Sequence, residues 1–263
     1  MNLPNRHIQN LLDCLTRSRL SFALYRLPWT DECYFVLQQS GDVEQLADIR
    51  ELNKKKGFVM APFLQSDHHP LIVIRPDITA YDWDEISEAI SSLECADALL
   101  TCKNQTEKLS PFVSEETDKE RYTQAFERFI TPLQKKHFQK LVLSRSSTKH
   151  INDDFSPLAA FVRACNNYPR MMIYLCHTPV SGTWVGSTPE ILLSGHGKEW
   201  HTVALAGTMP MQNEVMPMDW DKKNQDEQGY VADYIRRIIK KFGNKMNEKG
   251  PYTARAGQLV HLK

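Results

Sequence analysis

Two charged residues lie in or beside apolar segments of this chain, where they could move protons. Lys140 begins the apolar run at 140–145, and Glu190 precedes another at 191–193. In a strand, a lysine among apolar neighbours loses hydration, which favours the neutral form that acts as a base. A base and an acid in one chain predict proton-transfer chemistry. Each one alone is also explained as a charge at a strand end that reaches solvent.

Glu227 is a third candidate because of its place on a predicted helix at 226–242. Val231, four residues later, begins an apolar stripe, so Glu227 is expected on the buried side of the first turn. A buried carboxylate needs a partner, and Mg²⁺ takes carboxylate oxygens as ligands. The positive end of the helix also favours a carboxylate there without any metal. The residues alone leave both interpretations open.

A short segment at 204–210, with the sequence ALAGTMP, ends a predicted strand with a glycine, a hydroxyl and a proline. An ordinary turn accounts for this composition. Alternatively, exposed N–H groups and the Thr208 hydroxyl receive a carboxylate. The pattern is too short to decide between the two.

Hydrophobic periodicity predicts two groups of strands, each followed by a helix. The predicted helices lie at 7–17, from Ser114 to near Phe138, and at 226–242, with 82–100 helical or mixed. The predicted strands lie at 21–27, 33–38, 57–63, 71–76, 140–145, 171–176, 183–186, 190–193, 200–205 and 258–262. This order lacks the regular alternation of a parallel doubly wound sheet. We therefore expect an α+β fold, with largely antiparallel sheets packed with helices, in a single domain over 1–263.

The bulk composition excludes several classes of partner. The 263 residues include 32 basic and 32 acidic side chains, which argues against nucleic acid or an anionic membrane as the main partner. The chain has no apolar run of about 18 residues, so no membrane span is expected. The six cysteines are scattered without a CxxC pair, which indicates reduced core residues of a cytoplasmic protein.

Five sequence blocks resemble, in order and approximate spacing, those of the chorismate-utilising enzymes, and of isochorismate synthases in particular. They are KLVLSR at 140–145, GSTPE at 186–190, ALAGT at 204–208, KNQDEQ at 223–228 and LVHL at 259–262. The resemblance implies the chorismate-binding enzyme fold. It also implies a conserved-type catalytic part at 116–263 and a more variable part at 1–115.

By this resemblance, Lys140 is the general base that activates water for attack at C2 of chorismate. Glu190 is the general acid that protonates the departing C4 hydroxyl, and Glu227 is a ligand of Mg²⁺, which holds the substrate carboxylate. The resemblance further implies four residues that contact or line the substrate site: Ala206, Gly207, Thr208 and His261.

Two positions bear on the subfamily. The ammonia-using relatives usually lack a lysine where Lys140 stands, and the aminodeoxychorismate synthases carry a lysine where Ala206 stands. The water-using combination implies chorismate as the small-molecule substrate and no obligatory amidotransferase partner. Salicylate synthases share this combination and remain an alternative. A component of an ammonia-using, anthranilate-type synthase, which would need an amidotransferase partner, is another. The sequence leaves open whether the product feeds menaquinone, siderophore or salicylate synthesis.

Two departures from the resemblance affect the expectations. Gln228 stands where relatives often have histidine, a change expected to retune the metal site. The chain also stops at Lys263, whereas relatives continue with further magnesium carboxylates and a substrate-binding arginine. We therefore expect a C-terminally truncated piece of an isochorismate synthase with an incomplete fold, inactive alone because one carboxylate holds magnesium poorly. A non-catalytic remnant is the alternative.

Overall fold

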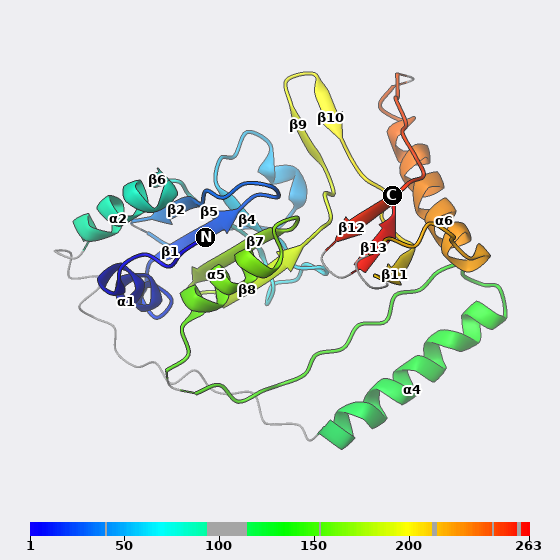
Figure 1. The fold of residues 1–263 in the computed structure, drawn as a ribbon, viewed down its shortest axis with the longest axis horizontal. Helices are drawn as coiled ribbons and strands as arrows, with labels where there is room; N and C mark the ends of the chain where they lie inside the picture. The colour runs from blue at the N-terminus through cyan, green and yellow to red at the C-terminus, as the bar shows by residue number, and fades with distance from the viewer. Residues whose placement is uncertain (40, 94–114, 153, 212–214, 244, 257–258) are drawn as a thin grey trace. The chain divides into compact units, whose positions relative to one another are not determined.

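The protein is described by a computed structural model that covers residues 1–39, 41–93, 115–152, 154–211, 215–243, 245–256 and 259–263. The chain divides into two compact units, shown in Figure 1. Unit 1 comprises Met1–Gln105 and Ser156–Pro189, and unit 2 comprises Thr106–Phe155 and Glu190–Lys263. Each unit therefore combines segments that are distant in the sequence. The expectation of a single domain over 1–263 stays a prediction.

Unit 1 is built on a five-stranded antiparallel sheet in the order β6-β2-β1-β7-β8. The strands are β1 (Ser21–Arg26), β2 (Tyr34–Gln38), β6 (Ile78–Tyr81), β7 (Met172–Thr178) and β8 (Gly182–Thr188). Side chains alternate along the central strand β1, so Phe22 and Leu24 enter one core cluster and Ala23 enters another. Both faces of this sheet are therefore covered.

Three helices cover one face of the sheet, and Figure 1 shows them beside it. They are α1 (Arg6–Leu15), α2 (Asp82–Leu93) and α5 (Pro157–Asn167). Side chains at helical spacing, among them Leu12, Ile86 and Phe161, are fully buried against the sheet. Helix α5 begins where the Ser156 hydroxyl accepts a hydrogen bond from the Ala159 N–H at 2.9 Å.

A smaller antiparallel sheet, in the order β3-β5-β4, packs on the other face. Its strands are β3 (Glu44–Leu46), β5 (Leu71–Ile74) and β4 (Phe58–Met60), and the short 3₁₀ helix η1 (Ile49–Leu52) follows β3. Ile72 and Ile74 of β5 share a buried cluster with Ala23, Val36 and Cys176 of the larger sheet. Unit 1 thus has three layers, one of helices and two of strands.

Four of the six cysteines, Cys14, Cys33, Cys165 and Cys176, lie in the described structure as free thiols. Burial raises the pKa of the Cys33 and Cys176 thiols to about 12, which keeps them protonated and unreactive. The expectation of reduced core cysteines is confirmed for these two and for buried Cys165; the remaining two, at 95 and 102, lie outside the described residues. Among the helices that the structure describes, none has the length and apolarity needed to cross a bilayer.

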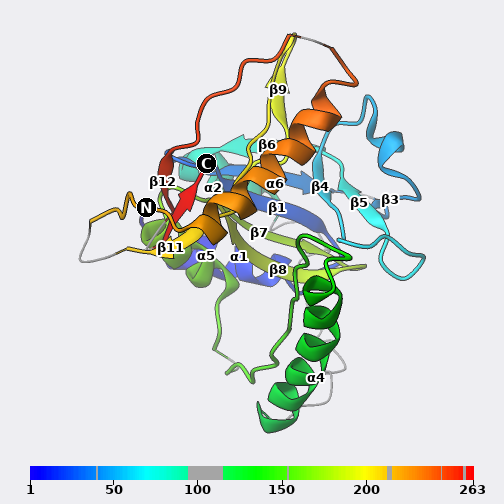
Figure 2. The same cartoon turned by 90° about the vertical axis from the view of Figure 1, so that its right-hand side faces the viewer.

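Unit 2 contains two small antiparallel sheets and two helices among its described residues. A three-stranded sheet has the order β11-β13-β12, and β9 and β10 form a hairpin. The elements are α4 (Glu115–Gln134), β9 (Ser194–His196), β10 (Glu199–His201), β11 (Thr208–Pro210), α6 (Lys222–Ile239), β12 (Thr253–Ala256) and β13 (Leu259–Leu262). Helix α6 packs against β13 and lies beside β11, as Figure 2 shows. This arrangement brings one face of α6 close to the loop that precedes β11.

The predicted α+β class with antiparallel sheets is confirmed, since every strand pair among the described residues is antiparallel. The strand predicted at 140–145 is wrong, because this segment is irregular. The strand predicted at 190–193 is also wrong, since β9 begins only at Ser194. Both segments carry consecutive apolar residues, but neither pairs its backbone with a strand in the described part of the chain. Ser114, the expected start of the long helix, lies outside the described residues.

The apolar stripe of α6 differs from its expected burial. Tyr234, Ile238 and Phe242 are exposed, and Gln228 is the residue of this helix that is buried. A helical period establishes which residues share a face, but it does not supply the surface that covers them. Six elements of the described structure had no counterpart among the predicted ones: α5, η1, β3, β6, β11 and β12.

The core of unit 1 predicts a large difference between two identical substitutions. Phe161 is fully buried under α5, whereas Phe63 is fully exposed in the loop after β4. We expect Phe161→Ala to reduce the free energy of unfolding by about 3–5 kcal/mol and Phe63→Ala by less than about 0.5 kcal/mol. Urea unfolding followed by circular dichroism measures both changes. Equal unfolding midpoints for the two variants would contradict this assignment of the core.

Candidate active site

One face of helix α6 carries three polar residues at helical spacing. Asn224, Glu227 and Gln228 stand at positions i, i+3 and i+4, so their side chains share one face. The helix begins at Asp221, whose carboxylate accepts hydrogen bonds from the Asn224 N–H at 2.8 Å and from its side-chain amide at 2.9 Å. This cap orients the first of the three side chains.

Lys140 and Glu227 form an ion pair in unit 2. The Lys140 Nζ donates to Glu227 Oε1 at 2.8 Å, and the two side chains are 32% and 29% exposed. The sequence context had suggested that Lys140 lies on the apolar side of a strand. In the structure it lies against a carboxylate instead. Glu227 lies in the second turn of α6, half-buried as expected, with this cation as its partner.

The loop Ala204–Thr208 is held on the same face of α6. The Gln228 Oε1 accepts from the Ala206 N–H at 3.0 Å, and its Nε2 donates to the Ala204 carbonyl at 2.9 Å. The Asn224 Oδ1 accepts from the Thr208 N–H at 3.2 Å. The N–H groups of Ala206 and Thr208 thus bind side chains of α6. The sequence had suggested that these N–H groups are exposed and receive a carboxylate, but both are already hydrogen-bonded to α6.

Strand β13 brings His261 next to this loop. Thr208 pairs with His261 in the β11–β13 register, and the Thr208 Oγ1 lies 3.1 Å from the ring Nδ1. The Leu262 N–H donates to the Gly207 carbonyl at 3.0 Å. Gly207 is buried, and a Cβ there would lie 3.2 Å from both the Asn224 carbonyl oxygen and the Trp220 ring. This close approach of backbone, helix and indole explains why the position has no side chain.

Partial burial lowers the pKa of the His261 imidazole below its ordinary value of 6.5. The hydrogen bond with the Gly207 backbone and the negative charge of Glu190 act in the opposite direction, and burial dominates. The influence of Glu190 indicates that its carboxylate, on the exposed connection between β8 and β9, lies near the ring. His261 is therefore the link between Glu190 and the loop.

Six of the seven residues expected at the site lie on α6 or β13 or contact one of them, and the seventh, Glu190, influences the charge of His261. Glu227 binds Lys140, and its neighbour Gln228 holds the loop. The loop contacts His261 through Thr208, and His261 interacts with the charge of Glu190. The structure brings the expected residues into one region. That Lys140 and Glu190 face each other across a substrate stays a prediction.

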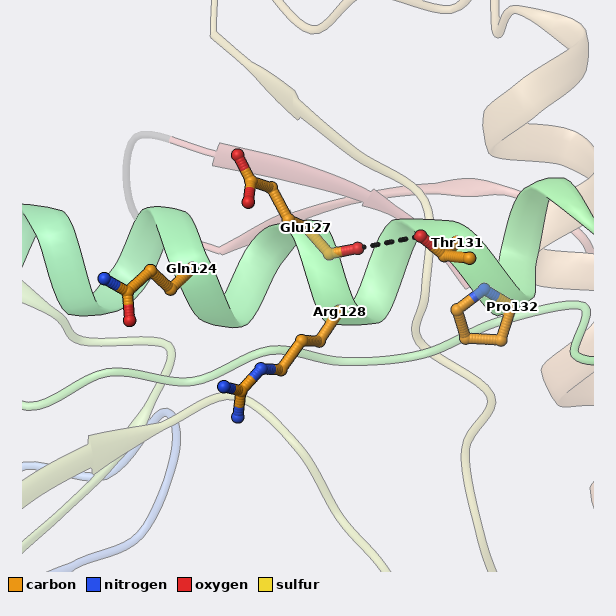
Figure 3. Close-up of a pocket in the computed structure, with 5 residues that line it drawn as sticks. All are labelled: Gln124, Glu127, Arg128, Thr131 and Pro132. Carbon is orange, nitrogen blue, oxygen red and sulfur yellow. Dashed lines mark hydrogen bonds between the residues drawn. The ribbon is translucent and has the colours of Figure 1, made fainter.

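A surface hollow elsewhere in unit 2 is not a counterpart of this site. It is lined by one face of α4, and Figure 3 shows its residues: Gln124, Glu127, Arg128, Thr131 and Pro132. The Thr131 hydroxyl donates to the Glu127 carbonyl at 3.1 Å within the same helix. Its walls come from one helix and include none of the expected site residues. The candidate chemistry therefore lies on α6 and not in this hollow.

The donors present do not form a complete magnesium site. Among the described residues, no three His, Cys, Asp or Glu side chains are grouped so that they could hold a metal ion. Glu227 offers one carboxylate, and one of its oxygens accepts from Lys140. Mg²⁺ needs about six oxygen ligands in near-octahedral geometry. Glu227 could therefore provide only a small part of such a coordination shell.

Sequence reasoning missed Asn224 and gave Gln228 a different role. Gln228 was expected to influence a metal, but its amide binds the loop backbone instead. The spacing of Asn224, Glu227 and Gln228 was available in the sequence. Amide side chains on an otherwise apolar helical face would have been the signal, because they need partners when buried.

Comparison with known proteins places this geometry in a family. The family model described as chorismate binding enzyme matches residues 50–263, well over half of the chain. The chain belongs to the chorismate binding enzyme family. Within the part that matches lie all seven expected site residues. No curated protein matches the chain in a sequence search.

Two solved structures share the fold of this chain. One is MenF, the menaquinone-specific isochorismate synthase from Escherichia coli, with a TM-score of 0.58 and 15% identity over 95% of this chain and 65% of MenF. The other is DhbC from Bacillus anthracis, assigned as a 2,3-dihydroxybenzoate-specific isochorismate synthase, with a TM-score of 0.59 and 15% identity over 97% of this chain and 69% of DhbC. The chain thus spans about two thirds of the length of each. At this identity the likeness concerns the fold.

The environment of His261 predicts its titration. We expect its pKa below the ordinary value of 6.5, because the folded protein disfavours the charged ring. The unfolded chain then binds the proton first, so stability is complete above pH 6.5 and falls as the pH drops through the folded pKa. Histidine ring resonances followed by NMR from pH 8 to 4 measure the midpoint, and a His261→Gln variant assigns the signal. A midpoint at or above 6.5 would contradict the burial described for this ring.

Proposed function

We propose that this chain carries the activity of an isochorismate synthase, converting chorismate to isochorismate. Membership of the chorismate binding enzyme family supports the substrate. The observation that carries the proposal is the Lys140–Glu227 ion pair, which lies next to the loop Ala204–Thr208 on one helix face. It places the amine proposed as the base on the same helix face as that loop. Lys140 stands where the ammonia-using relatives usually lack a lysine, which favours water, and Ala206 stands where the aminodeoxychorismate synthases carry a nucleophilic lysine.

The proposed reaction exchanges one water for another across the conjugated ring. Lys140, in its neutral form, takes a proton from water as the water oxygen bonds to C2. The double bonds shift and the bond between C4 and its hydroxyl oxygen breaks. Glu190 gives a proton to that oxygen, which leaves as water. Lys140 ends protonated and Glu190 ends ionised, so a proton must return from one to the other before the next turnover.

The ion pair sets a condition on this mechanism. While Glu227 accepts from the Lys140 ammonium, the lysine is a donor and not a base. The base role therefore requires the pair to separate or lose its charge when substrate binds. Magnesium dependence is part of the proposal, with Glu227 as one ligand. Bound magnesium would neutralise and orient the substrate carboxylate.

The proposal includes chorismate as a small-molecule partner and no obligatory amidotransferase. A cytoplasmic location is also proposed, since the four described thiols are free. The function is tested by incubating the protein with chorismate, Mg²⁺ and an ammonium salt and separating the products by chromatography. The ammonium salt makes ammonia available as a competing nucleophile. Isochorismate as the product supports the proposal. Salicylate or anthranilate would assign the chain to another reaction, and unchanged chorismate would contradict enzymatic activity.

Replacement of Lys140 separates its role as a base from its role as a cation. We expect Lys140→Ala to lower kcat by about 10²–10⁴-fold, the usual contribution of a general base. Lys140→Arg keeps a cation for Glu227 but stays protonated, so we expect a similar loss. Steady-state formation of isochorismate measures both, with the exposed Lys149→Ala as a matched control in the same segment. Substantial activity in Lys140→Arg would remove Lys140 as the base.

Replacement of Glu190 tests the proposed acid. Glu190→Gln keeps the size of the side chain but removes the proton that it would donate, so we expect kcat to fall about 10²–10⁴-fold. The matched control is Glu199→Gln, an exposed residue of β10. Isochorismate formation is measured for both variants across pH 5–9. If Glu190→Gln retains the activity of the control, another group protonates the leaving hydroxyl.

A further inference from the structure

Gln228 is a buried polar side chain on a helix whose large apolar side chains are partly exposed. It is 6% exposed and is the buried residue of α6, although Tyr234 and Ile238 on the same helix are exposed. A glutamine is mostly exposed in folded proteins, and burial is unfavourable unless its amide is hydrogen-bonded. The position therefore has a specific requirement for the amide.

Both ends of this amide bind the backbone of one loop. The Oε1 accepts from the Ala206 N–H at 3.0 Å, and the Nε2 donates to the Ala204 carbonyl at 2.9 Å. This orientation gives each backbone group a partner of the correct kind, whereas a flipped amide would oppose donor to donor and acceptor to acceptor. Gln228 thus contacts Ala204 and Ala206 as a neighbouring strand would.

The two contacts lie beside the Lys140–Glu227 pair. Glu227 precedes Gln228 on the helix, so the carboxylate that binds Lys140 and the amide that binds the loop belong to consecutive residues. Asn224, one turn earlier, holds the loop at the Thr208 N–H. Side chains fixed on one helical face keep constant distances, and the loop is therefore kept at a constant position relative to Lys140.

We propose that Gln228 is a positioning residue that sets the register between the Ala204–Thr208 loop and the Lys140–Glu227 pair. It acts through the backbone of Ala204 and Ala206 and does not touch the reacting atoms. This inference rests on the proposed function, in which the loop contacts chorismate. Loss of the amide frees the loop, so the substrate binds less tightly while Lys140 and Glu190 remain in place. The expected signature is a raised KM with a smaller change in kcat.

Gln228→Met is the decisive substitution. Methionine has a similar length, but its thioether cannot donate a hydrogen bond and accepts one only weakly. We expect KM for chorismate to rise about tenfold, the equivalent of 1.4 kcal/mol, with kcat changed less than about threefold. The matched control is Gln225→Met, three residues earlier on an exposed part of the same helix. Its KM should equal that of the unaltered protein.

A second readout needs no substrate. Amide hydrogen exchange should become faster at Ala206 in Gln228→Met, while the β12–β13 pair keeps its protection. Gln228→Glu retains an acceptor for the Ala206 N–H but, when ionised, cannot donate to the Ala204 carbonyl. This variant should keep the protection at Ala206 and show an intermediate KM. It keeps the test available if Gln228→Met does not fold.

Two results would overturn the inference. One is unchanged exchange at Ala206 in Gln228→Met, and the other is a KM within twofold of the unaltered protein. A parallel loss of kcat and folded protein with KM unchanged would show a merely structural role and would also overturn it. Absence of isochorismate from the unaltered protein contradicts the proposed function instead. Exchange at Ala206 then still decides whether Gln228 holds the loop.

Discussion

The spacing of three polar side chains on one face of α6 is the constraint on which the candidate site depends. Helical geometry places Asn224, Glu227 and Gln228 side by side, and each holds a different group of unit 2. The two amides bind the backbone of one loop, and the carboxylate binds Lys140. The helix therefore acts as the common reference for a loop and a cation that come from distant parts of the sequence.

The bonds that build this site are polar, whereas unit 1 is held by burial of apolar side chains. In unit 1 the central strand β1 has apolar layers on both faces. In unit 2, α6 buries an amide and leaves Tyr234 and Ile238 exposed. A typical intramolecular hydrogen bond contributes about 0.5–1.5 kcal/mol net, because water replaces it in the unfolded chain, whereas a buried polar group left without a partner costs about 1–3 kcal/mol. The loop geometry therefore depends more on the burial of Gln228 than on the number of its bonds.

The sequence predicted the fold class and most elements of unit 1, because β1 and β2 are nearly continuous apolar runs, the pattern of strands buried on both faces. It failed at 140–145 and 190–193, where apolar composition resembles a strand but the backbone pairs with none of the described strands. Residue type and context alone singled out Lys140, Glu190, Glu227 and Thr208 as candidates. The order of five short blocks added Ala206, Gly207 and His261. The ion pair joins Lys140 to Glu227 across 87 positions, and no periodicity within either segment reports such a contact.

The pairing of Lys140 with Glu227 joins two roles that the sequence assigned separately. The Lys140 Nζ donates its hydrogen bond to Glu227, and the Glu227 carboxylate therefore has one oxygen already engaged. Neither residue can perform its proposed task while the other keeps its charge and place. Release of the lysine as a base and release of Glu227 as a ligand are then the same event. Since Gln228 keeps the loop next to this pair, a substrate bound by the loop reaches the site where that event must occur.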